Sequence, residues 1–163
     1  MFIQRRSGGI RFAVLAAFLL AAGSAAAQPL VQIGSAREAD APDSEFHFAG
    51  GYEIGFVVLP VSIVAVAQTG SGIRSGEDSR QFPLRGYLTV RAGLLPLPGF
   101  RVYLGAGGGM SARTGGEDGL SASPSLIGLG GIATGRLHLE VQYQRDLTDV
   151  PVSRWVTAVG LSF

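Results

Sequence analysis

The feature that most constrains this chain is an alternation of apolar and polar residues with a period of two. In the segment 136–147, RLHLEVQYQRDL, the apolar residues Leu137, Leu139, Val141 and Tyr143 occupy one set of alternate positions, and mostly charged or amide residues occupy the other. Successive side chains of a β-strand point to opposite faces. The pattern therefore predicts a strand with one apolar and one polar face, since an amphipathic helix would repeat every three or four residues.

Seven further segments show the same alternation, clearly or in a weaker form, so the chain is predicted to be all-β with eight strands. The predicted strands are 30–35, 46–58, 61–69, 85–94, 100–110, 125–133, 136–147 and 154–163. The connections alternate between short turns, such as PLPG at 96–99, and longer polar segments, such as 34–45, 70–81 and 111–123. This layout is typical of an antiparallel up-and-down β-barrel that crosses a membrane.

Composition favours the transmembrane barrel over a soluble domain with the same strands. The chain is 47% hydrophobic and only 15% charged, with a mean hydropathy of +0.32, whereas soluble domains carry about 25% charged residues. The longest apolar segment of the predicted barrel, 54–67, contains Pro60 and is shorter than the roughly 20 residues of a spanning helix. Alternation alone leaves open which face meets lipid, so a secreted soluble barrel remains the alternative.

The first 27 residues have the layout of a secretory signal peptide. Three arginines precede an apolar run at 12–22, and the small residues Ala25, Ala26 and Ala27 follow it. A basic region, an apolar core and a small-residue cleavage site are the three parts of such a signal. We expect cleavage between Ala27 and Gln28, which removes 1–27 and leaves 28–163 as one barrel domain. The alternative is a retained membrane helix, for which the apolar run is short.

Three segments carry a resemblance to a known family. RVYLGAGGGMSAR at 101–113, LHLEVQYQRDL at 137–147 and VTAVGLSF at 156–163 resemble the small outer-membrane β-barrels of the eight-stranded OmpA/OmpX type. The resemblance implies a bacterial outer-membrane location and contact with outer-membrane lipids, including lipopolysaccharide. It also implies that the barrel-assembly machinery recognises the last strand. The residues implied in that signal are Trp155, Val159, Leu161 and Phe163.

The polar faces of the predicted strands place charged residues inside the barrel. These inward residues are Glu53, Arg85, Arg91, Arg101 and Glu140. The interior of an eight-stranded barrel is just wide enough for side chains to fill, and buried charges must be paired. We therefore expect a network of ion pairs that closes the lumen, with a narrow gated path for ions or small solutes as the alternative.

Other function classes find little support. The chain has no cysteine, and its only histidines, His47 and His138, do not form the His-x-Ser pair of lipid A deacylases. No catalytic residue, metal site or cofactor is therefore predicted. Acidic residues outnumber basic ones after residue 27, which argues against nucleic acid as a partner. We predict a monomer with a structural or surface-interaction role and no catalysis; a narrow channel is the second hypothesis, and a lipid A-modifying or other envelope enzyme is the third.

Overall fold

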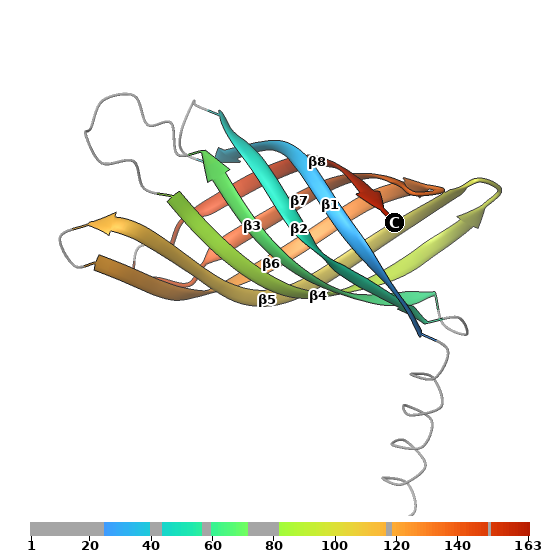
Figure 1. The fold of residues 1–163 in the computed structure, drawn as a ribbon, viewed down its shortest axis with the longest axis horizontal. Helices are drawn as coiled ribbons and strands as arrows, with labels where there is room; N and C mark the ends of the chain where they lie inside the picture. The colour runs from blue at the N-terminus through green and yellow to red at the C-terminus, as the bar shows by residue number, and fades with distance from the viewer. Residues whose placement is uncertain (1–24, 40–43, 57–59, 72–81, 117–118, 150) are drawn as a thin grey trace, which may run out of the picture.

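The protein folds into a closed barrel of eight antiparallel strands (Figure 1). The computed structural model describes residues 25–39, 44–56, 60–71, 82–116, 119–149 and 151–163. The strands are β1 (Ala25–Glu38), β2 (Ser44–Phe56), β3 (Val61–Ser71), β4 (Phe82–Leu97), β5 (Phe100–Gly116), β6 (Gly119–Thr134), β7 (Leu137–Asp146) and β8 (Ser153–Ser162). The predicted all-β, up-and-down barrel of eight strands is confirmed.

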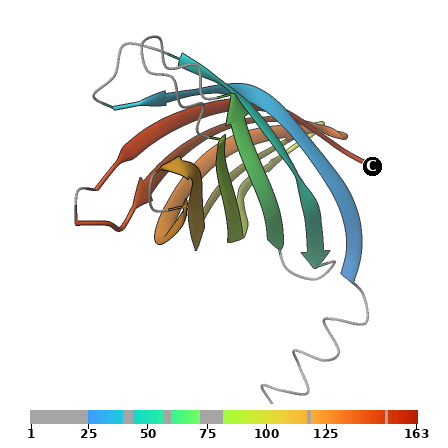
Figure 2. The same ribbon diagram turned by 60° about the vertical axis from the view of Figure 1, so that its left-hand side comes forward.

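Each strand pairs with its neighbours in sequence, and β1 pairs with β8 to close the sheet. The closing seam runs from Leu30 opposite Ser162 to Glu38 opposite Arg154. Figure 2 shows the same strands turned by 60°, curving around a common interior. Closure pairs the backbone groups of all eight strands, which is what a sheet must achieve within hydrocarbon.

The barrel carries apolar side chains outside and polar side chains inside. Along β7, exposed and buried residues alternate at every position. Leu139 and Val141 are exposed, whereas His138, Glu140 and Gln142 are buried. A soluble barrel would place these faces the other way round, so the apolar exterior identifies the lipid-facing surface. In the described part of the chain, no helix is long and apolar enough to cross a membrane.

Most of the exposed aromatic residues in the described chain lie near the two ends of this apolar surface, whereas Phe48 and Tyr52 are exposed between them. Phe46, Tyr143 and Trp155 lie toward the end with the longer connections, and Phe100 and Phe163 lie toward the short-turn end. The rings of Tyr143 and Trp155 are in contact, with centroids 5.0 Å apart. Two aromatic bands of this kind mark the two membrane–water interfaces of transmembrane barrels.

The longer connections are shorter than predicted, and the predicted loop at 111–123 is wrong. β5 continues to Gly116 and β6 begins at Gly119, so Ser111 pairs with Ser123 and Ala112 with Ala122. In the same way, β1 continues to Glu38 and β2 begins at Ser44. Small and polar residues suggested loops here, but a strand that extends beyond the bilayer needs no apolar face and can pair through its backbone alone.

Glycines permit two different features of the fold. Gly99 and Gly135 have positive φ values of 79° and 56° in the short turns, a conformation that suits residues without a Cβ. On the inner face of β5, a Cβ on Gly107 or Gly109 would collide with the backbone of β4. These two glycines allow close approach of two backbones. At Gly105 a Cβ would meet the Val90 carbonyl oxygen of β4 and also the side chains of Leu129 and Arg91.

Candidate functional site

The lumen contains the charged residues that alternation assigned to it. Glu53 lies on β2, Arg85 and Arg91 on β4, Arg101 on β5 and Glu140 on β7. Four of them are buried, whereas half of the Arg101 side chain is exposed. Arg101 lies at the short-turn end, directly after the β4–β5 turn. Of these five predicted residues, Arg101 is therefore the one that is exposed at the mouth of the lumen.

The first charged cluster lies in the half of the lumen near the short turns. The Arg91 guanidinium is 2.7 Å from the Glu140 carboxylate and 3.5 Å from that of Glu53. Arg101 is 3.4 Å from Glu53, and the Tyr103 hydroxyl donates a 3.0 Å hydrogen bond to Glu140. The Arg91 guanidinium also lies 5.2 Å from the Tyr103 ring centre. Five side chains from four strands are thus linked by charge and hydrogen bonding.

A second cluster lies toward the longer connections. Arg85 is 3.5 Å from the Asp146 carboxylate, to which Ser111 donates a hydrogen bond of 3.4 Å. Arg154 donates from Nε to the Gln144 side-chain oxygen at 2.6 Å. Asp146 and Arg154 are not among the residues of the predicted network. Both occupy polar faces of their strands, so the same alternation could have identified them.

Glutamine side chains connect the two clusters. Gln142 donates to Glu140 at 2.6 Å, and Gln144 donates to Gln142 at 2.6 Å. Gln144 also donates to Gln68 across the lumen at 2.8 Å. All three glutamines are nearly fully buried. A chain of polar contacts therefore extends from Glu53 near one mouth to Arg154 near the other.

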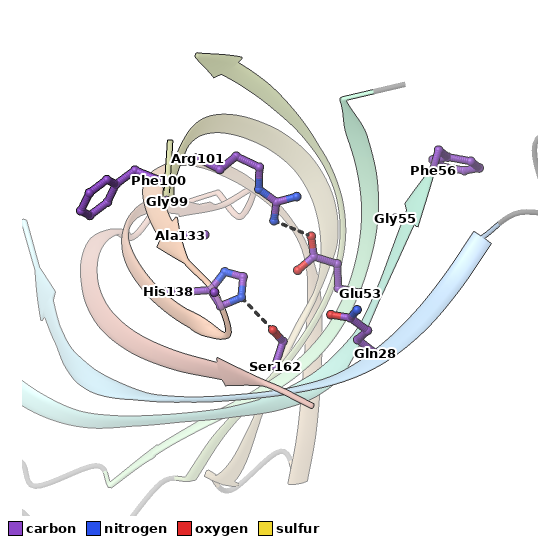
Figure 3. Close-up of a pocket in the computed structure, with 11 residues that line it drawn as sticks. Gln28, Glu53, Gly55, Phe56, Gly99, Phe100, Arg101, Ala133, His138 and Ser162 are labelled. Atoms are coloured by element: carbon purple, nitrogen blue, oxygen red, sulfur yellow. Dashed lines mark hydrogen bonds and ion pairs between the residues drawn. The ribbon is translucent and has the colours of Figure 1, made fainter. Parts of the chain in front are cut away.

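A histidine and a serine meet at the short-turn end. His138 Nε2 lies 3.1 Å from Ser162 Oγ (Figure 3), a pair that the search for His-x-Ser on one strand missed. The β7–β8 register, with His138 opposite Gly160, places the two residues on adjacent strands. His138 Nδ1 has no hydrogen-bond partner, so this pair lacks the carboxylate that orients the histidine in a serine hydrolase.

The other histidine, His47, does not form a site together with His138. His47 is fully buried, and neither of its ring nitrogens has a hydrogen-bond partner. Within the described residues, no three His, Cys, Asp or Glu side chains are placed to hold a metal ion.

The short-turn mouth contains a cavity of about 530 Å³. Its polar lining consists of Gln28, Glu53, Arg101, His138 and Ser162. Figure 3 shows the Arg101 and Glu53 side chains pointing toward each other inside the mouth, whereas the rings of Phe56 and Phe100 point away from it. The mouth is thus a polar vestibule that leads to the buried Arg91–Glu140 pair.

The residues of the predicted assembly signal lie on the outer face of the last strand. Trp155, Val159, Leu161 and Phe163 are all exposed, and the Phe163 amide donates to the Pro29 carbonyl at 3.0 Å. Their part in assembly stays a prediction.

The predicted cleavage junction lies inside β1, where Ala27 pairs with Ile54 and Gln28 with Glu53. Most of the predicted signal peptide, 1–24, lies outside the described residues, and its removal also stays a prediction.

No known protein-family model matches the chain, and no curated protein matches it in sequence. Solved structures do match its fold. Neisserial surface protein A is 11% identical, with a TM-score of 0.62 over 83% of this chain and 94% of that protein. The N-terminal β-barrel domain of Pseudomonas aeruginosa OprF is 14% identical, with a TM-score of 0.56 over 83% and 97%. A designed transmembrane β-barrel is 12% identical, with a TM-score of 0.51 over 83% and 95%.

These likenesses at low identity concern the fold, and they agree with the apolar exterior and polar interior described above. This fold and the apolar outer surface agree with the predicted bacterial outer-membrane location. The chain has the fold of the small eight-stranded outer-membrane β-barrels, the group that its sequence resembles.

Proposed function

We propose that the protein is a closed, non-catalytic barrel that acts as a rigid scaffold in the outer membrane, with a structural or surface-interaction role. The observation that carries this proposal is the polar network that crosses the lumen. Arg91 with Glu140 and Gln142 with Gln144 lie at successive levels and are each linked by short contacts. The burial of these side chains supports a filled lumen, in which they would take the space that an ion needs.

The exterior supports the same role. The apolar surface between the two aromatic bands suits contact with outer-membrane lipids, with lipopolysaccharide as the expected lipid around the longer connections. Short turns face the periplasm in barrels of this architecture, and the longer connections face outward. Among the hairpins whose strands are joined by one of the longer connections, β5–β6 is the longest in the described part of the chain, with strands of 17 and 16 residues. It is the part of the described chain best placed to meet partners outside the cell.

Conductance across a planar bilayer tests the closed lumen. Refolded parent protein is expected to show no discrete openings. A double variant, Arg91→Ala with Glu140→Ala, removes both members of the shortest ion pair and is expected to conduct more than the parent. As a matched control, Arg145→Ala changes an exposed arginine on the outer face of β7 and should stay silent. Discrete openings of the parent protein would favour the narrow channel instead.

A further inference from the structure

We propose that signal cleavage after Ala27 places the new α-ammonium group of Gln28 in the short-turn mouth, where the Glu53 carboxylate binds it and protects Gln28 from cyclisation. The occupant of this part of the cavity is thus the chain's own amino terminus. The inference rests on the fold and on the predicted signal peptide, and it is independent of whether the lumen conducts.

The strand register makes the junction a natural boundary. β1 pairs with β2 from Ala25 onward, but its pairing with β8 begins only at Leu30, preceded by the bond from the Phe163 amide to the Pro29 carbonyl. The residues 25–27 therefore have a neighbouring strand on one side only. Cleavage after Ala27 removes this one-sided extension and leaves the two-sided part of β1 intact.

Gln28 lies directly opposite Glu53 in the β1–β2 ladder. Opposite residues of an antiparallel pair have their Cβ atoms about 4.5–5.5 Å apart. Both residues line the mouth cavity, and Figure 3 shows their side chains next to each other there. A terminal ammonium on Gln28 is therefore within reach of the Glu53 carboxylate.

The two arginine contacts of the Glu53 carboxylate are long for ion pairs. Its contacts to Arg91 and Arg101 measure 3.5 and 3.4 Å, and its side chain is only 8% exposed. Hydrogen bonds between charged nitrogen and oxygen groups are typically about 2.7–2.9 Å long, as in the Arg91–Glu140 pair at 2.7 Å. A terminal ammonium, with three N–H donors, would give this buried carboxylate the short contact that the two arginines do not supply.

The other polar groups around the mouth permit this arrangement. Arg101, His138 and Ser162 complete the polar lining together with Gln28 and Glu53. Arg101 has the same charge sign as the ammonium, but half of its side chain is exposed, so it can turn toward solvent. Ser162 and His138 Nε2 already contact each other. Glu53 is the one carboxylate among the described lining residues.

The bond to Glu53 matters because an amino-terminal glutamine can cyclise. In that reaction the neutral α-amine attacks the side-chain Cδ, a C–N bond forms, and the bond from Cδ to the amide nitrogen breaks. The amide nitrogen leaves as ammonia, and the chain then begins with an uncharged lactam. A protonated ammonium has no free electron pair with which to attack. Binding by Glu53 favours the protonated form, so the folded barrel should slow the cyclisation.

The absence of lysine from the sequence makes the test selective, because the α-amine is then the only primary amine of the mature chain. Intact mass first establishes that the purified protein begins at Gln28 with a free amine. The rate of acylation by a succinimidyl ester is then measured against pH, for the folded barrel and in urea. An α-amine ordinarily loses its proton near pH 8. The folded parent should show a midpoint about one pH unit or more higher, because a close carboxylate favours the charged form.

Two variants separate the role of Glu53 from general effects of charge. Glu53→Gln should return the midpoint to its value in urea and should accumulate the lactam several-fold faster on storage. The matched control Glu45→Gln, near the other end of β2, should behave like the parent. Arg101→Gln removes a competing cation while keeping Glu53, so its midpoint should move upward; this variant keeps the test decisive if Glu53→Gln does not fold.

Several results would overturn the proposal. A mature chain that begins at another residue removes its premise. A lactam in freshly folded parent protein contradicts the protection. Equal midpoints for the parent and Glu53→Gln, or no upward movement in Arg101→Gln, would show that Glu53 does not bind the amino terminus.

Discussion

Replacing Glu140 by alanine tests the central contact of the lumen. The Glu140 carboxylate contacts Arg91 at 2.7 Å and accepts hydrogen bonds from Tyr103 and Gln142 at 3.0 and 2.6 Å. Among the described residues, its loss leaves the 3.5 Å contact to Glu53 as the remaining ion pair of the buried Arg91 guanidinium. Breaking a buried ion pair on one side costs about 3–5 kcal/mol. This corresponds to a change of roughly a hundredfold or more in the equilibrium constant for unfolding.

Urea unfolding of the refolded barrel in detergent micelles measures this loss. Trp155 is the only tryptophan in the sequence, and its exposed position on β8 makes its fluorescence a reporter of release from the apolar environment. Glu140→Gln keeps the size of the side chain and removes the charge, so it should fall between the parent and Glu140→Ala. Arg145→Ala, on the exposed face of the same strand, should unfold like the parent. An unchanged unfolding free energy for Glu140→Ala would refute the buried pair and indicate a wet lumen.

Three further predictions address the backbone, assembly and chemistry. Gly109→Ala should destabilise the barrel severely in urea unfolding, because a Cβ there meets the Gly86 carbonyl. Gly86→Ala should be neutral or stabilising by up to about 1 kcal/mol, because no atom lies within 4 Å of a Cβ at that position. If Gly86→Ala were the more destabilising of the two, the described packing of β4 and β5 would be wrong. Phe163→Asp should reduce the amount of barrel found in outer-membrane fractions more than a change within 70–81, and equal insertion of both variants would contradict the assembly signal. A fluorophosphonate probe should leave Ser162 unlabelled in the parent, because His138 Nδ1 has no partner; labelling that Ser162→Ala abolishes would support the enzyme hypothesis.

The face of each lumen residue could be predicted from the sequence, because the alternation of inward and outward side chains is a local property. It stays the same when a strand is longer or shorter than predicted. Glu140 and His138 are buried and Leu139 is exposed, as their positions in 136–147 require. The pattern has no information about distance across the barrel. The partner of Arg85 is Asp146, 61 positions away in the chain, and only the stagger of eight closed strands brings the two together.

Strand ends were harder to predict than faces, for a physical reason. Inside the bilayer a strand must present apolar side chains, so its extent can be read from hydropathy. Beyond the bilayer the same strand is held by backbone hydrogen bonds, to which Gly116 and Gly119 contribute as well as any other residue. The His138–Ser162 contact was missed because the two residues lie on different strands, and a search within one strand cannot find such a pair.

The extension of the β5–β6 hairpin beyond the membrane has a consequence for antibody recognition. A strand needs about 9–11 residues to cross the hydrocarbon, so β5, with 17 residues, exceeds that length by roughly six. At about 3.4 Å per residue, this excess extends at most about 20 Å on the side of the longer connections. Its backbone donors and acceptors are engaged by the opposite strand. Antibodies raised against a linear peptide of this region should therefore bind the denatured chain better than intact cells, whereas antibodies raised against the folded barrel should show the reverse preference.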